Sequence, residues 1–283
     1  MINQKLLVSG ADYFTDDYKI NPYYADVEID LEKAKQEHAH IVDCFRQAGI
    51  EIVKVDPPKN CQDGVYTANW AIVKDGVAIM ARLPQARKDE EPYARKILEE
   101  QGIKTLLAPE GCLFSGQGDS LRCGKYLFAG RGYRSDPAAQ EFVAKTLDLE
   151  LIQLHANPQL NPDGTEHINP VTNHADSFWY DLDLAVSIID EHTIAYCPGA
   201  LDEESNAKLE AITDLDKIIV DYKECTEGFA CNLVSTGETV IMSSKAPKLK
   251  AALEKRGLTC ITPEISELLK GGGYIRCISL WLS

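Results

Sequence analysis

Short apolar runs alternate with amphipathic segments along the whole chain, and this alternation limits the fold more than any other feature. Residues 31–48 carry apolar side chains at helical spacing and end before Gly49, a residue that commonly follows a helix. The apolar run at residues 51–55 follows directly and has the length of a strand. Repeated through the chain, this pattern predicts an α/β protein with one shared core.

The same patterns predict the other elements. Apolar runs with the length of strands lie at residues 71–73, 77–80, 103–107, 126–129, 149–154, 182–189, 218–220, 239–242, 258–261 and 275–282. Segments with helical spacing lie between them at residues 92–101, 137–147, 202–212, 247–256 and 265–269. Helices and strands therefore interleave in units of roughly 50–60 residues, as they do in α/β folds.

Two connecting segments have distinct compositions. Asp75 and Gly76 lie between two apolar runs, and both residue types accept the positive φ angles of a tight hairpin turn. Residues 156–177 are rich in Asn, Pro, Asp and Gly and contain no periodic apolar pattern. We expect this longest irregular segment to form a surface loop or a lid.

The composition is that of an ordinary globular chain, with 45% apolar and 26% charged residues. A chain of 283 residues can bury a core without disulfides or metal ions. No Pro-rich or Ser-rich linker divides it. We therefore predict a single α/β domain over residues 1–283.

Charge and cysteine usage exclude several classes of partner and compartment. The chain has 29 Lys and Arg against 44 Asp and Glu, a net charge of −15, which disfavours binding to nucleic acid. No stretch approaches the roughly 20 apolar residues of a membrane span, and the first residues lack the apolar segment of a secretory signal. The nine cysteines show no CxxC spacing. Reduced thiols in a cytoplasmic protein are the expected state.

The sequence offers no motif that indicates a bound cofactor or metal ion. The sequence contains no phosphate-binding loop, dinucleotide fingerprint, zinc-ligand spacing or serine nucleophile elbow. His38 and His40 are two residues apart on a predicted helix, so their side chains do not face each other. We therefore expect neither a cofactor nor a metal ion.

The segment GGGYIRCISL, residues 271–280, is the strongest chemical signal in the chain. Its three glycines allow the backbone to approach other groups closely, and they bring Cys277 to the start of a predicted strand. Taken alone, the segment fits a nucleophilic cysteine, and it equally fits a buried thiol after a flexible turn.

Five further blocks decide between these interpretations. They are INPY at 20–23, DGVYTAN at 63–69, GQGD at 116–119, GRGYRSD at 130–136 and CN at 231–232. Together with the cysteine segment, they give the chain a resemblance to the guanidino-group-modifying (pentein or amidinotransferase) superfamily. This superfamily includes dimethylarginine dimethylaminohydrolases, arginine deiminases and dihydrolases, and amidinotransferases. The resemblance extends over about the whole chain.

The resemblance implies both a fold and a reaction. The fold is an α/β propeller of five pseudo-symmetric ββαβ units around a central site. In the reaction, a cysteine thiolate attacks the central carbon of a guanidinium group and an amine leaves. The resulting covalent thiouronium adduct is then resolved by water or by an acceptor amine.

The resemblance also implies roles for individual residues. Cys277 would be the nucleophile, and Asp183 would hold the guanidinium group of a small-molecule substrate. Carboxylate and amide oxygens accept hydrogen bonds from planar N–H groups, whereas the Arg fork matches a carboxylate. The implied substrate-binding residues are accordingly Asp63, Asn69 and Asp119 with Arg87 and Arg134, the two arginines holding the α-carboxylate of the substrate. Asn69 is the residue type that the arginine dihydrolase branch carries at this position.

Two residues depart from the superfamily pattern. Asp181 occupies the position of a histidine that acts as the general acid and base, and Ser115 stands where a carboxylate is common. On a strand, Asp181 and Asp183 would share a face. An imidazolium beside a thiol favours the thiolate, whereas a carboxylate raises the pKa of the thiol. A cationic substrate, a protonated Asp181 that acts as the acid, or His174 from the preceding loop could compensate.

Three functions remain as alternatives. The first is a hydrolase that cleaves a C–N bond of an arginine-like guanidino compound through Cys277. The second is an amidinotransferase that uses the same adduct, and the third is a weak or silent member that only binds an arginine-like ligand. The sequence leaves self-association into a homo-oligomer open.

Overall fold

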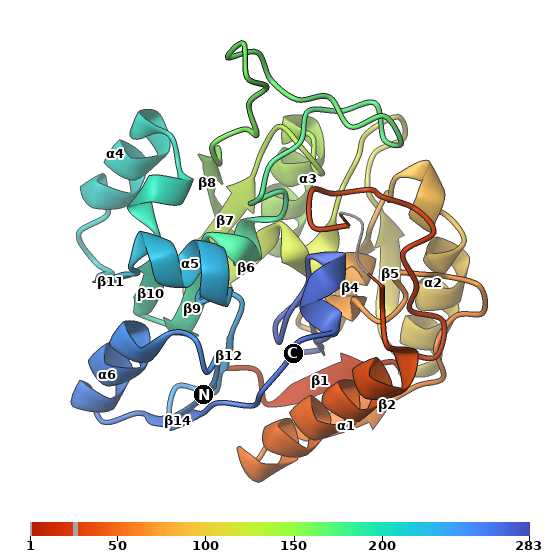
Figure 1. Cartoon of the computed structure of the whole chain (residues 1–283), viewed down its shortest axis with the longest axis horizontal. Coiled ribbons are helices and arrows are strands. Elements are labelled where there is room, and N and C mark those ends of the chain that lie inside the picture. Colours follow the sequence, from red (N-terminus) through yellow and green to blue (C-terminus); the bar gives the residue numbers. More distant parts are fainter. Residues whose placement is uncertain (1, 25–27) are drawn as a thin grey trace.

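Five three-stranded sheets surround a common centre (Figure 1). The computed structural model describes residues 2–24 and 28–283. In every sheet the middle strand pairs antiparallel with one neighbour and parallel with the other. This is the arrangement of five ββαβ units, so the predicted α/β propeller is confirmed.

Four of the units are continuous in sequence, and each consists of two antiparallel strands, a helix and a third strand. Their elements are β3 (Ala71–Lys74), β4 (Val77–Met80), α2 (Glu90–Glu100) and β5 (Lys104–Leu107); β6 (Ser120–Cys123), β7 (Tyr126–Gly130), α3 (Pro137–Leu147) and β8 (Glu150–Leu154); β9 (Val186–Asp190), β10 (Thr193–Tyr196), α4 (Glu203–Ala211) and β11 (Asp216–Ile219); and β12 (Val234–Ser235), β13 (Thr239–Ile241), α6 (Pro247–Lys255) and β14 (Thr259–Ile261). The fourth unit is preceded by α5 (Tyr222–Gly228).

The fifth unit joins the two ends of the chain and thereby closes the ring. Its elements are β15 (Leu280–Trp281), β1 (Lys5–Val8), α1 (Leu31–Gln47) and β2 (Glu51–Lys54). In the antiparallel pair β1–β15, Leu6 lies opposite Trp281 and Leu7 opposite Leu280. Leu7 and Leu280 are fully buried and pack with Trp70. The last strand therefore completes both the sheet and part of the core.

The helices lie outside the sheets, and their apolar faces cover the core (Figure 1). Helix α1 begins after Asp30, whose carboxylate accepts a hydrogen bond from the backbone N–H of Lys33, and buries Ile41 and Phe45. Such capping and helical spacing explain why the helix predictions from sequence lie close to the observed bounds.

Short 3-10 turns lie between these strands and helices. They are η1 (Thr67–Trp70), η2 (Gln85–Arg87), η3 (Gly116–Gly118), η4 (Leu182–Leu184), η5 (Pro198–Ala200) and η6 (Leu268–Gly271). The turns η1, η3, η4 and η6 connect strands of different sheets, whereas η2 and η5 connect a strand to the helix of the same unit. Several of the residues predicted for the site lie in or beside these turns, so the turns, and not regular strands, set the geometry of the centre.

Three predicted elements require correction. The predicted strand at 182–189 is the turn η4 followed by β9. Within the predicted strand at 275–282, only Leu280–Trp281 form a strand, β15. The predicted helix at 265–269 is the short turn η6. An apolar run of this length fits a buried turn as well as a strand, because periodicity does not separate them.

Other elements follow or extend the predictions. The hairpin turn is confirmed, with φ angles of 51° at Asp75 and 73° at Gly76. Strands β1, β6, β10 and β12 and helix α5 were not predicted. Each of these strands has four residues or fewer, too few for a clear alternation of apolar and polar side chains.

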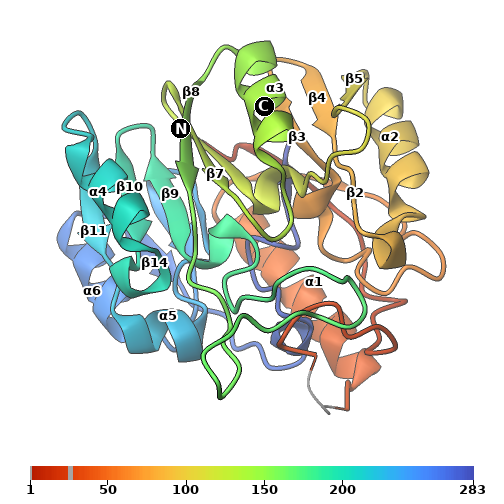
Figure 2. The ribbon, with the colours of Figure 1, turned by 90° about the horizontal axis from the view of Figure 1, so that it is seen from above.

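The irregular segment 156–177 contains no named helix or strand among the described residues. Figure 2 places this segment, in green, on the same side of the molecule as the N-terminal segment before α1, in red. Asn169 donates a hydrogen bond to the backbone oxygen of Lys19 at 3.1 Å, and Tyr23 donates to the backbone oxygen of Phe178 at 2.9 Å. The two segments therefore form one surface. In the part of the chain that the structure describes, no helix has the length and apolar character of a membrane span.

The closure of the ring gives a test of stability. Leu280→Ala removes a fully buried side chain from the β1–β15 pair, and we expect it to lower the free energy of unfolding by about 2–5 kcal/mol in urea denaturation. Leu107→Ala on β5 is the control, since Leu107 is 49% exposed and its loss should change stability by about 0.5 kcal/mol or less. Equal effects of the two substitutions would contradict this account.

Candidate active site

The glycine segment before Cys277 is packed against tyrosine side chains, and this packing is the reason for its composition. A Cβ on Gly271 would lie 2.3 Å from the hydroxyl oxygen of Tyr66, and one on Gly273 would lie 2.3 Å from the ring of the same tyrosine. The Tyr66 hydroxyl donates to the backbone oxygen of Leu268 at 2.6 Å, and the Tyr180 hydroxyl donates to that of Gly272 at 2.9 Å. Glycine is therefore required by close approach.

Cys277 lies in a turn that precedes β15, so the expectation that it begins a strand is wrong. One side chain, Asn232, fixes its position. The Asn232 carbonyl oxygen accepts hydrogen bonds from the backbone N–H groups of Arg276 (2.9 Å) and Cys277 (3.2 Å). Its amide nitrogen lies 3.1 Å from the Cys277 Sγ atom.

Asp183 faces the thiol directly. Its Oδ2 atom lies 3.4 Å from the Cys277 Sγ atom, and both side chains are buried. Burial raises the pKa of the Cys277 thiol well above its usual value, and the carboxylates of Asp183 and Asp181 raise it further. Burial and the neighbouring Asp181 likewise raise the pKa of Asp183. The surroundings of Cys277 and Asp183 therefore stabilise the anionic forms of these two side chains less well than water does.

Asp181 carries an unused hydrogen-bond acceptor. Its Oδ2 atom accepts a hydrogen bond of 2.7 Å from Asn69, while its Oδ1 atom is buried and has no partner among the described residues. Asp181 and Asp183 are both 1% exposed, as we expect from the sequence, although they lie at the turn η4 and not on one strand. A buried carboxylate oxygen without a donor is costly, which indicates that a ligand supplies the donor.

Asp119 holds the segment that carries these two aspartates. Its Oδ1 atom accepts a hydrogen bond of 3.1 Å from the backbone N–H of Leu182. Burial, with Asp181 as the next cause, raises the pKa of Asp119 well above its ordinary value. The structure therefore connects Asp119 to the backbone between the two aspartates.

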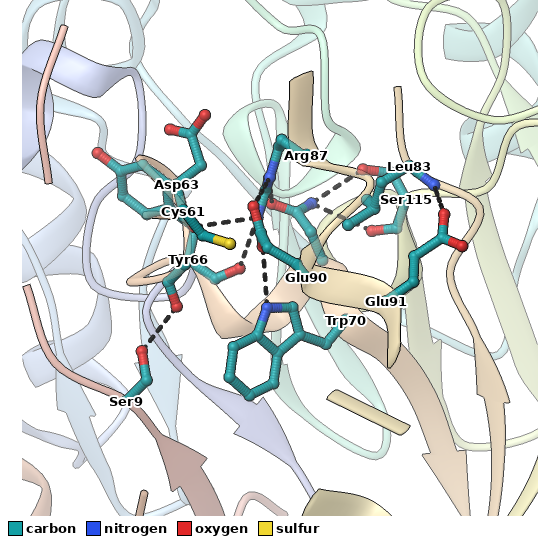
Figure 3. A network of polar contacts seen from close by, with 12 residues as sticks. Ser9, Cys61, Asp63, Tyr66, Trp70, Leu83, Arg87, Glu90, Glu91 and Ser115 are labelled. Carbon is teal, nitrogen blue, oxygen red and sulfur yellow. Dashed lines mark hydrogen bonds and ion pairs between the residues drawn. The ribbon is translucent and has the colours of Figure 1, made fainter. Parts of the chain in front are cut away.

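Arg87 belongs to a buried chain of hydrogen bonds that includes Glu90 and Trp70 (Figure 3). Its Nε and Nη2 atoms bind the two carboxylate oxygens of Glu90 at 2.8 and 2.7 Å, and its Nη1 atom donates to Asn69 at 2.7 Å. Trp70 donates to the same glutamate at 3.0 Å. The partners of Arg87 thus differ from the substrate carboxylate that the resemblance implies, and they orient Asn69 toward Asp181.

Asn69 also connects to Ser115. Its amide nitrogen donates to the Ser115 hydroxyl at 2.9 Å and to the Ser115 backbone oxygen at 3.1 Å. Gly118 lies against this group, because a Cβ there would be 2.4 Å from the Asn69 nitrogen and 2.8 Å from the Asp181 carboxylate. The GQGD block therefore allows close contact between η1 and η4.

Asp63 and Arg134 line the side of the site that faces the N-terminal segment. The Tyr24 hydroxyl donates to the Asp63 carboxylate at 2.5 Å, and burial raises the pKa of Asp63 to about 6. The guanidinium carbon of Arg134 lies 4.5 Å from the centre of the Tyr180 ring, and its Nη2 atom donates to the backbone oxygen of Ile20 at 2.9 Å. Within the described residues, no carboxylate forms an ion pair with Arg134.

Histidine and metal ligands do not contribute to this arrangement. His174 is exposed in the loop, whereas Cys277 is buried. His38 is buried on α1, and burial lowers its pKa to about 4. Among the described residues, no group of three or more His, Cys, Asp or Glu side chains is arranged to hold a metal ion.

Two residues of the centre, Asn232 and Arg276, were not singled out from the sequence. Asn232 was present in the CN block, but nothing in that block specified its contacts to Cys277. Arg276 lies within the cysteine segment itself, and its guanidinium group binds Gln117 at 2.8 Å and the Ser279 backbone oxygen at 2.7 Å. The contacts from Asn232 to Cys277 and from Gln117 to Arg276 join positions far apart in the chain, so no local pattern predicts them.

The fold and the site define a class, and the comparisons with known proteins specify it. A five-unit α/β propeller with a buried cysteine opposite an aspartate is the arrangement of the guanidino-group-modifying superfamily. The chain belongs to the family described as N,N dimethylarginine dimethylhydrolase, eukaryotic, whose model matches residues 14–281.

Individual relatives are similar over almost the whole chain. It is 30% identical over 285 residues to a bifunctional arginine dihydrolase/ornithine cyclodeaminase, ArgZ, of Synechocystis, covering 98% of this chain and 37% of the relative. The chain therefore spans little more than a third of that bifunctional protein. It is 29% identical to an N(G),N(G)-dimethylarginine dimethylaminohydrolase of Mycobacterium tuberculosis, covering 95% of this chain and 82% of the relative.

Solved structures agree with these relatives. The N-terminal domain of ArgZ bound to product superposes with a TM-score of 0.88 at 28% identity, covering 99% of this chain and 97% of that domain. A variant of the same domain, covalently bound to a reaction intermediate, matches with a TM-score of 0.88 at 27% identity, covering 99% and 97% of the two chains.

The raised pKa of Asp63 predicts a dependence of stability on pH. A folded-state pKa of about 6, against an ordinary 3.8, means that the folded state holds the proton more tightly than the unfolded state. The resulting stability is fully present below about pH 4 and is lost as the pH rises through 6, by about 3 kcal/mol in total.

We expect Asp63→Asn to remove this part of the pH dependence in urea denaturation at pH 4, 5, 6 and 7. The matched control is Asp43→Asn on the exposed face of α1, which should leave the slope of the wild-type protein unchanged. Parallel slopes for wild type and Asp63→Asn would show that Asp63 does not titrate in this range.

Proposed function

We propose that the protein is a cysteine-dependent hydrolase that cleaves a C–N bond of an arginine-like guanidino compound. The observation that carries the proposal is the Cys277 thiol, 3.4 Å from the Asp183 carboxylate, in a buried site where a further carboxylate oxygen of Asp181 has no donor. A guanidinium group supplies both the positive charge and the N–H donors that these groups need. The family membership supports the same chemistry.

The predicted site residues other than Asp63 each have a role in this proposal. Asp183 and Asp181 accept hydrogen bonds from the guanidinium group and direct its central carbon toward the Cys277 sulfur. Asp119 positions the turn that carries the two aspartates, and the Arg87–Asn69 chain positions Asp181. Arg134 is the cation available for the α-carboxylate of the substrate.

The reaction follows from these positions. The Cys277 thiol loses its proton to Asp181, and the thiolate sulfur forms a bond to the guanidinium carbon. The C–N bond to a terminal nitrogen then breaks, and that nitrogen leaves as an amine after taking the proton from Asp181. Asp181, ionised again, takes one proton from the water that attacks the carbon of the remaining thiouronium adduct. The C–S bond breaks, the sulfur receives the second proton of the water, and a ureido product and the free thiol result. Asp181 then loses its proton to the solvent.

The substrate we favour carries an unmethylated guanidinium group. Carboxylate oxygens of Asp181 and Asp183 are buried and require N–H donors, which two methyl groups on a terminal nitrogen would remove. The relatives include both an arginine dihydrolase and a dimethylarginine dimethylaminohydrolase, so this choice rests on the site. A cytoplasmic location and self-association into a homo-oligomer stay predictions.

The function is tested by product formation. The purified protein is incubated with arginine, methylated arginines, agmatine, citrulline and guanidino acids, and products are identified by mass spectrometry. We expect a ureido product from arginine or agmatine that disappears in Cys277→Ala, because no other thiol takes its place. Cys260→Ala, which removes a half-buried thiol on β14, is the control and should retain turnover.

Other outcomes separate the alternatives. Product that forms only when an amine is added would identify an amidinotransferase. Binding of arginine without any product, in wild type as in Cys277→Ala, would identify a ligand-binding protein. Unchanged turnover in Cys277→Ala would exclude Cys277 as the nucleophile.

The proton transfer proposed for Asp181 is tested separately. Asp181→Asn keeps the shape of the side chain but cannot carry a proton, and we expect the rate of turnover to fall by about 10²–10⁴-fold. Asp181 has to be ionised to take the thiol proton, and burial raises its pKa, so activity in the wild type should increase as the pH rises through that raised pKa, and Asp181→Asn should lack this limb.

Asp181→His provides the complementary substitution. We expect lower turnover, because Asn69 donates a hydrogen bond to a carboxylate at this position and the imidazole does not reproduce both oxygens. Higher turnover in Asp181→His would mean instead that the replacement of the superfamily histidine by Asp181 has lowered the activity.

A further inference from the structure

Arg276, the residue directly before Cys277, is a buried cation without an ion-pair partner among the described residues. Its side chain is held by neutral oxygens alone. The Nη2 atom donates to Gln117 at 2.8 Å, and the Nη1 atom donates to the Ser279 backbone oxygen at 2.7 Å and lies 3.4 Å from the Ser279 hydroxyl. Only 8% of Arg276 is exposed.

Gln117, the main side-chain partner of Arg276, adds no negative charge. Its amide nitrogen donates to the backbone oxygen of Trp281 at 2.8 Å, while its carbonyl oxygen accepts from both Arg276 and the backbone N–H of Trp281. Arg87, another buried arginine of the centre, is neutralised by Glu90 at 2.7 Å, whereas Arg134 forms no ion pair within the described residues. A buried charge without a counter-ion is unfavourable, so the charge of Arg276 has to be offset by another group in the centre.

The charged and titratable groups around the Cys277 thiol identify the group that offsets the charge of Arg276. Asp181 and Asp183 face Cys277 from the turn η4, and the hydroxyl groups of Tyr23, Tyr66 and Tyr180 face it from the N-terminal segment, η1 and the segment before η4. All of these are neutral or negative. Arg276 lines one small cavity together with Asp183, whose carboxylate lies 3.4 Å from the Cys277 sulfur, and Arg122 of β6 lines the same cavity.

We propose that Arg276 is a positioning residue that supplies a fixed positive charge beside Cys277 and thereby stabilises the thiolate. The proposal rests on the role of Cys277 as the nucleophile. A guanidinium group does not lose its proton in the working pH range, so its effect on the thiol does not depend on pH as that of an imidazole would. Asn232 couples the two residues mechanically, since one carbonyl oxygen accepts from both backbone N–H groups.

The test measures the ionisation of the thiol and not turnover. Cys277 is alkylated with iodoacetamide at pH 5 to 10, and the rate is followed on its peptide by mass spectrometry. In Arg276→Gln we expect the thiol pKa to rise by at least about one unit, so that alkylation at pH 7 slows by about tenfold. Arg276→Lys, which retains the charge, should restore most of the rate.

Gln117→Glu provides a variant in which Arg276 remains in place. The new carboxylate would pair with the guanidinium group, and we expect it to raise the thiol pKa in the same direction as Arg276→Gln. Arg122→Gln is the matched control, because it removes a second arginine of the same cavity, whose guanidinium carbon lies 3.9 Å from the centre of the Trp281 ring and which donates a hydrogen bond to the backbone oxygen of Ser283. It should leave the thiol pKa unchanged.

The outcomes separate an electrostatic from a structural role. An unchanged thiol pKa in Arg276→Gln or in Gln117→Glu overturns the proposal, as does an equal loss of rate at every pH in Arg276→Gln and Arg276→Lys. If Arg276→Gln does not fold, as judged by its thermal melting curve, the Lys and Glu variants still decide. A shifted thiol pKa without any product from the guanidino compounds would retain this proposal and refute the proposed function.

Discussion

The negative charge buried around Cys277 is the constraint on which the rest of the site depends. Asp119, Asp181 and Asp183 lie out of contact with water, and burial raises the pKa of each. Backbone N–H groups and the Asn69 amide satisfy part of their oxygens, yet one oxygen of Asp181 has no donor among the described residues. A cation that carries several N–H groups, such as a guanidinium compound, would supply both a donor for this oxygen and further positive charge.

The propeller holds these groups together by placing turns, not strands, at its centre. The turns η1, η3 and η4 come from different units, and their contacts are short because Gly118 and the glycine segment have no side chains in the way. Closure of the ring by β1 and β15 fixes the chain just after Cys277. A site of buried, mutually repelling groups needs such rigid support, since each group would otherwise move toward water.

Sequence patterns predicted elements whose signal is local. The helices followed from apolar spacing, the hairpin followed from Asp75 and Gly76, and the α/β alternation led to the correct class of fold. The apolar run at 182–189 was misread as one strand, because a buried turn and a buried strand have the same composition. Asp181 and Asp183 were placed in the centre for the wrong local reason, since the turn η4 and not a shared strand face brings both inside.

The sequence by itself determined the fold class and predicted which residues form the candidate site, because both depend on residue types in a fixed order along the chain. The tertiary structure alone decided how those residues are paired. Arg87 binds Glu90 and Asn69 and leaves Arg134 as the cation without an ion pair at the tyrosine side of the site. Asn232 reaches Cys277 across 45 positions of sequence, and Gln117 reaches Arg276 across 159. The electrostatic balance of a buried site depends on distances between segments that are remote in the sequence. These distances are set only when the ring of sheets closes.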